Sequence, residues 1–198
     1  MQFSSWIAWV ANVIVLAWST VVMVQAQTVT FSDITDAVPS RFFDAATTTP
    51  DPGDGNKLLI GLSTGFDAAT WTVNEFTAST AAFYHAFAMD TISFLIEAPP
   101  NFYIAKITYT QSGTHAISRT GRVAGGVHWV VDGDPADLGL SDAGSPLSGT
   151  VDLTGQNKTS VQVSITVSLF TAALPRLGAA STSITSAEVS VELRSLSE

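Results

Sequence analysis

TSVQVSITVSL, residues 159–169, alternates apolar and polar side chains without a break. A period of two is typical of a β-strand that buries one face and exposes the other. The C-terminal stretch AEVSVELR, residues 187–194, repeats the pattern. Strands with one polar face belong to antiparallel sheets that have one face in water. The two stretches therefore predict layered antiparallel sheets.

Most of the chain after residue 26 fits short strands separated by turns. Further strands are predicted at residues 28–31, 57–62, 90–98 and 102–110. The glycine-containing segments 111–113 and 125–126 are interpreted as hairpin turns, which join this region into a meander with Tyr109 opposite His115. Regularly spaced short strands predict an all-β fold, either an antiparallel β-sandwich or a jelly roll.

Residues 74–89 fit two patterns. The preceding TVNE, residues 72–75, matches a capping box, and the phenylalanines that follow it recur at helical spacing. The alternation of residues 83–89 fits a strand equally well. We expect at most one short helix around residues 74–89.

The N-terminal segment carries an export signal. Residues 6–26 contain no charged side chain and end in Val24-Gln25-Ala26, which matches the small-residue site of a signal peptidase. We predict an apolar signal helix in residues 1–26, cleavage after Ala26, and a single β-sandwich domain in residues 27–198. The alternative is an uncleaved membrane anchor, because about 20 apolar residues suffice to cross a bilayer and no Lys or Arg precedes the run. Both interpretations place the domain outside the cytoplasm, secreted or as a membrane-anchored ectodomain.

The composition excludes several classes of function. The net charge of −9 repels nucleic acid, so we expect no nucleic-acid partner, and contact with a membrane only if residues 6–26 are retained. The chain has no cysteine, which excludes disulfides and thiolate chemistry. Only 13% of residues are charged, and Ser and Thr take polar strand positions instead.

One stretch of sequence matches a catalytic motif. Gly61-Leu62-Ser63-Thr64-Gly65 matches G-x-S-x-G after a predicted strand, which makes Ser63 the candidate nucleophile of an exported hydrolase acting on polysaccharide or ester. A nucleophile elbow needs a parallel sheet with crossover helices, whereas this chain alternates strand with strand. We therefore take a non-enzymatic function as the first hypothesis and the hydrolase as its alternative.

Asp132, Asp134 and Asp137 form an acidic loop with the ligand chemistry of a calcium site, and residues 51–56 form a similar loop. The loop lacks the spacing of a full calcium-binding motif, and Asp and Gly are also what ordinary turns contain. No cofactor is required, and calcium is the candidate ion. Asn157-Lys158-Thr159 is a glycosylation sequon if the host is a eukaryote.

Aromatic residues suggest a sugar-stacking platform, with burial as the alternative for Trp129 in its apolar strand. The candidates are Trp71, Tyr84, Tyr103, Tyr109 and Trp129. The first hypothesis is thus an exported, non-enzymatic β-sandwich that is a structural, surface or carbohydrate-binding component. Copies of the chain are a second class of partner, through strand edges at residues 28–31 or in the last segment.

Overall fold

The computed structural model describes residues 27–37, 43–62, 71–72, 84–119, 122–138, 147–173 and 178–196. Within these ranges every regular element is a β-strand, and no helix is present. The strands are β1 (Thr30–Asp36), β2 (Thr49–Asp51), β3 (Asp54–Leu59), β4 (Trp71–Thr72), β5 (Tyr84–Glu97), β6 (Phe102–Arg119), β7 (Arg122–Val131), β8 (Asp134–Leu138), β9 (Leu147–Asp152), β10 (Ser160–Ala173) and β11 (Gly178–Ser195).

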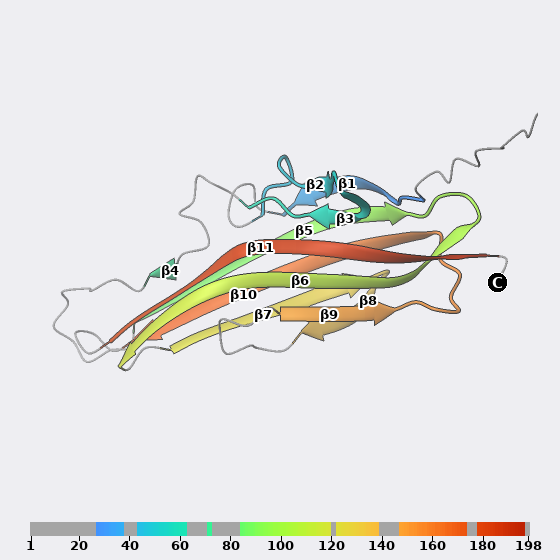
Figure 1. The fold of residues 1–198 in the computed structure, drawn as a ribbon. Coiled ribbons are helices and arrows are strands. Elements are labelled where there is room, and N and C mark those ends of the chain that lie inside the picture. Colours follow the sequence, from blue (N-terminus) through green and yellow to red (C-terminus); the bar gives the residue numbers. More distant parts are fainter. Residues whose placement is uncertain are drawn as a thin grey trace, which may run out of the picture.

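The strands form two antiparallel sheets, which confirms the predicted β-sandwich architecture. The five-stranded sheet has the order β1-β5-β10-β7-β8, and the six-stranded sheet has the order β2-β3-β11-β6-β9, with β4 also paired to β11. Figure 1 shows the two sheets as layers whose long strands, β5, β6, β10 and β11, run along the length of the molecule. Every strand pair is antiparallel.

The core lies between the sheets, and the alternation of residues 159–169 decides which side chains enter it. Between Val161 and Leu169 of β10 the apolar residues are buried and the residues between them are not. The facing layer comes from β6 and β11, whose inward residues include Ile107, Tyr109 and Val189. Because the chain has no disulfide, this continuous apolar layer holds the sheets together.

The predicted meander is wrong. β6 runs through residues 111–113 without a turn, and β7 runs through residues 125–126. Tyr109 pairs with Val189 of β11, and β5, β6 and β7 do not pair with one another. The two glycines are explained by their places within strands. Gly113 lies beside a bulge in β11, and a Cβ on Gly125 would stand 3.2 Å from Leu169 Cδ2.

The ambiguous segment is resolved in part. Residues 84–89 belong to β5, so the strand interpretation is correct there, while residues 73–83 lie outside the described residues. The predicted signal segment, residues 1–26, and its cleavage site after Ala26 also lie outside them. None of the described residues belongs to a helix that could cross a bilayer.

The last segment is also placed differently from expectation. β11 lies between β3 and β6, so it is an interior strand and offers no free edge along its pairing with them. The strand predicted at residues 28–31 corresponds to β1, which is the outermost strand of the five-stranded sheet. Its register shifts between Ser32 and Thr35, because Asp33 adopts a left-handed conformation with φ 51°.

Candidate functional site

A row of charged residues crosses the outer face of the six-stranded sheet. Lys106 of β6 lies opposite Glu192 of β11 on one side and opposite Asp152 of β9 on the other. Residues directly opposite one another in antiparallel strands point to the same face of the sheet. The strand register therefore places Lys106 between two carboxylates, Glu192 and Asp152, which come from segments far apart in the sequence.

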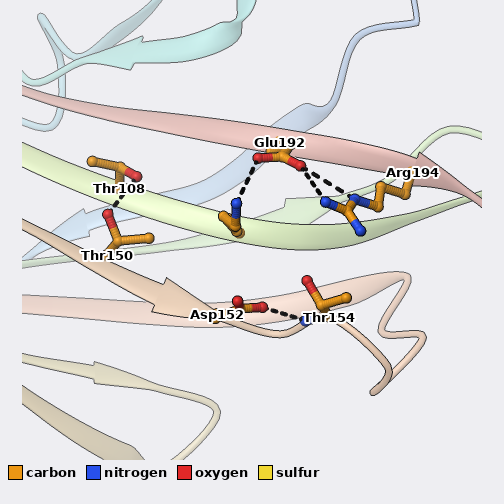
Figure 2. Close-up of polar contacts among 7 residues, drawn as sticks. Thr108, Thr150, Asp152, Thr154, Glu192 and Arg194 are labelled. Atoms are coloured by element: carbon orange, nitrogen blue, oxygen red, sulfur yellow. Dashed lines mark hydrogen bonds and ion pairs between the residues drawn. The ribbon is translucent and has the colours of Figure 1, made fainter.

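Glu192 is held by two cations. Its Oε2 lies 3.3 Å from Lys106 Nζ, and its Oε1 accepts hydrogen bonds from Arg194 Nε and Nη2, both at 3.2 Å (Figure 2). All three side chains remain partly accessible to water. The carboxylate is thus fixed in direction and still exposed on one side.

Asp152 is fixed by the turn that follows β9. Its Oδ1 accepts a hydrogen bond of 2.8 Å from the backbone N–H of Thr154, and Figure 2 shows the contact at the end of the strand. Hydrogen bonds from Thr154 lower the pKa of Asp152, and the hydrogen bond from Lys106 is the largest cause that lowers the pKa of Glu192. Both carboxylates are therefore ionised at neutral pH.

This ionisation argues against acid–base catalysis by the row. A glycoside hydrolase needs one carboxyl group whose pKa is raised, so that it can act as the proton donor. Asp152 and Glu192 both have a lowered pKa. The pair is suited to accept hydrogen bonds from a ligand.

Hydroxyl groups continue the face beyond the charged row. Thr108 Oγ1 lies 2.9 Å from Thr150 Oγ1, and Thr110 Oγ1 lies 3.2 Å from Ser148 Oγ (Figure 2 shows the first pair). We call this surface the polar face. It consists of Lys106, Thr108, Thr110, Ser148, Thr150, Asp152, Glu192 and Arg194.

Of the predicted aromatic platform, Tyr103 is the one member described at the surface. It is half-buried and lies opposite Arg194 in the strand register, next to the polar face. Glu192 is the main cause that raises the pKa of Arg194, and a hydrogen bond with Tyr103 contributes. Tyr109 and Trp129 are fully buried, with ring centroids 6.3 Å apart. The side chains of Trp71 and Tyr84 lie outside the described residues.

The predicted calcium loop contains a tight turn. Asp132 and Gly133 connect β7 to β8 with φ values of 51° and 89°, the two positive angles of a type I′ hairpin. Asp132 Oδ2 lies 2.6 Å from Lys158 Nζ, and Oδ1 accepts a hydrogen bond from the Gln162 N–H. Across the described residues, no three His, Cys, Asp or Glu side chains are grouped to hold a metal ion.

These contacts already engage both oxygens of Asp132. Asp134 is exposed, and the side chain of Asp137 lies outside the described residues. Calcium binding therefore stays a prediction. Asn157 of the glycosylation sequon is exposed in the connection from β9 to β10, where a glycan has access. Glycosylation also stays a prediction, since it depends on the host.

Ser63 lies outside the described residues, whereas Gly61 and Leu62 of the same motif are described. β3 pairs antiparallel with both β2 and β11, unlike the strand that precedes a nucleophile elbow. Gly61 has a packing role, because a Cβ there would lie 2.7 Å from the carbonyl oxygen of Asp44. The first glycine of the motif is thus explained without catalysis, and the hydrolase stays an untested alternative.

Sequence reasoning missed the charged row. Glu97 and Glu192 are both exposed, but nothing local in the sequence indicates that Glu192 meets Lys106. The one sequence feature that could have indicated the row is the set of polar residues that alternate with the apolar ones in each strand. A scan against protein-family models finds no match, and a search of curated proteins finds no relative.

Proposed function

We propose that the protein is an exported, non-enzymatic binding module that holds carbohydrate on the polar face. The observation that carries the proposal is the row Asp152–Lys106–Glu192, in which both carboxylates are ionised, oriented and exposed. Ionised carboxylates accept strong hydrogen bonds, and a hydroxyl-rich ligand supplies many donors. Arg194 offers donors to ring and hydroxyl oxygens, and Tyr103 offers an aromatic ring beside them.

The fold supports the same proposal. We infer that the sandwich is a jelly roll, because eight of its strands make two four-stranded layers, β3-β11-β6-β9 and β5-β10-β7-β8, through which the chain passes back and forth. Double-sheet jelly rolls are found in lectin domains. This likeness in architecture is an analogy, and the residues of the polar face carry the functional argument.

Export is the second part of the proposal, supported by the uncharged residues 6–26 and by the acidic, cysteine-free domain. The intact mass of protein recovered from the medium tests it. A mass that begins at Gln27 supports a secreted protein. Recovery of the full chain in the membrane fraction supports the anchored alternative, and recovery in cytosol contradicts both.

Carbohydrate binding is tested with a glycan array followed by calorimetry on the best ligand. Glu192→Gln and Asp152→Asn each remove charge from the row while keeping the side-chain shape. A hydrogen bond to a charged group contributes about 1.5–3 kcal/mol, so each variant should weaken binding by roughly 10–100-fold. Glu188→Gln is the matched control, since Glu188 is on the same outer face and is paired with Lys57 at 3.4 Å.

The control should bind as the unmodified protein does. No binding to any glycan, or an equal loss in all three variants, contradicts the proposal. A screen for polysaccharide and ester hydrolysis, with Ser63→Ala as its control, tests the alternative. Turnover that Ser63→Ala abolishes would establish the hydrolase instead.

A further inference from the structure

The outermost strands of the two sheets differ in how they resist pairing with another chain. Exposed edges are ordinarily protected by shortness, proline, bulges or charge. β1 carries a register shift at Asp33, β2 has three residues and contains Pro50, and β8 contains Pro135. These three edges are therefore poor templates for an added strand.

β9 has no proline and no bulge, and its one charged residue is Asp152 at its end. Its six residues, LSGTVD, pair with β6 without a register shift and include no proline, lysine or arginine. Leu153, just after β9, donates its N–H to the carbonyl oxygen of Ala105 in β6 at 2.7 Å. Since bonding directions alternate along an antiparallel strand, the backbone N–H and C=O groups of Ser148 and Thr150 point away from β6.

We propose that β9 is a homodimer interface, at which the β9 strands of two copies pair antiparallel about a two-fold axis at Gly149. In this register Ser148 of each copy exchanges backbone hydrogen bonds with Thr150 of the other. Leu147 comes opposite Val151, and both side chains are inward-facing and only half-buried in the single chain. The two six-stranded sheets then form one continuous sheet.

The position of the charged residue Asp152 favours the register centred on Gly149 over a shifted one. The chain carries a net charge of −9, so two copies repel one another wherever like charges meet. Asp152 is the one charged residue of β9, and it falls outside the five paired residues. A register shifted to Thr150 would set Asp152 against Ser148 and separate Leu147 from Val151. A second copy also supplies an edge of the same length with the same outward-pointing backbone groups.

Sedimentation velocity over a wide range of protein concentration tests the interface, without carbohydrate so that the result is independent of the proposed ligand. The unmodified protein should pass from monomer to dimer. Thr150→Pro removes an outward N–H and should leave a folded monomer. Thr108→Ala is the matched control, because it removes the 2.9 Å hydroxyl contact with Thr150 and leaves the β9 backbone intact. It should dimerise normally.

A second measurement keeps the test decisive if Thr150→Pro does not fold. The chain has no cysteine, so a single introduced one reports contact between copies. Gly149→Cys should form a covalent dimer on mild oxidation, because paired positions at a two-fold axis bring their Cα atoms within disulfide range. Glu97→Cys, on the other sheet, should not. A monomer at every concentration, polymers larger than a dimer, or equal cross-linking of the two variants would overturn the proposal.

Discussion

Gly61→Ala is the substitution for which the structure gives the clearest prediction. The segment that begins at Asp44 folds back on Gly61: the Asp44 N–H donates to the Gly61 carbonyl at 2.9 Å, and the Gly61 N–H donates to Thr48 Oγ1 at 2.9 Å. A Cβ on residue 61 would contact Thr47 Oγ1 and stand 2.7 Å from two backbone atoms, the Asp44 oxygen and the Thr47 carbonyl carbon. Backbone atoms cannot rotate away as a side chain can.

The expected cost follows from this crowding. Overpacking a tight site costs about 1–3 kcal/mol, and the two backbone contacts place Gly61→Ala at about 2–3 kcal/mol. For a domain of this size, each kcal/mol lowers the melting temperature by roughly 2–4 °C, so a fall of roughly 4–12 °C is expected. Thermal unfolding followed by circular dichroism measures it.

Gly53→Ala is the matched control. A Cβ at Gly53 meets nothing closer than Asp51 Oδ1 at 3.4 Å, so its effect should stay within about 0.5 kcal/mol. If Gly61→Ala melts with the unmodified protein, the segment does not pack on Gly61, and the structural explanation of the first glycine in G-x-S-x-G is refuted.

Three further predictions follow from the polar contacts. Because the pKa of Glu192 is lowered in the folded state, this carboxylate should stabilise the fold above its unfolded pKa, and the stabilisation should be lost as pH falls through the folded pKa. A carboxyl NMR titration should show the lowered pKa of Glu192, and Lys106→Met should raise that pKa. Tyr109→Phe removes the buried 2.7 Å bond to Gln111 Oε1 and should cost about 1–3 kcal/mol in urea unfolding, whereas an unchanged midpoint would show that Gln111 finds another donor. The predicted calcium loop requires that a chelator lower the melting temperature and that Asp134→Asn remove this response; indifference to the chelator contradicts it.

The architecture could be predicted from the sequence because burial leaves a local pattern. The period of two in residues 159–169 predicted the inner face of β10, and the same period predicted the C-terminal strand but not its place in the sheet. Strand pairing leaves no such pattern. Gly113 and Gly125 were interpreted as turns, yet Gly113 lies by a bulge and Gly125 packs near Leu169. A glycine in a strand has the same local sequence signal as a glycine in a hairpin.

The candidate site could not be predicted either, because strand pairing leaves no local pattern in the sequence. Glu192 and Lys106 are adjacent because β11 inserts beside β6, and this contact depends on the register of strands that are distant in sequence. Asp132-Gly133 was visible as a turn pair, but its partner Lys158 was not. A site whose residues come from several strands can be predicted only when the strand order is known, whereas a turn can be inferred from a few consecutive residues.

The position of β11 has a consequence for how the molecule is made. β11 follows β3 and β6 in the chain, yet it lies between them and joins them into one sheet. That layer cannot close before β11 has been synthesised, and contacts this distant in sequence form slowly. A chain made only as far as β6 therefore lacks the strand that joins β3 to β6, so this sheet is completed only after β11 has been made.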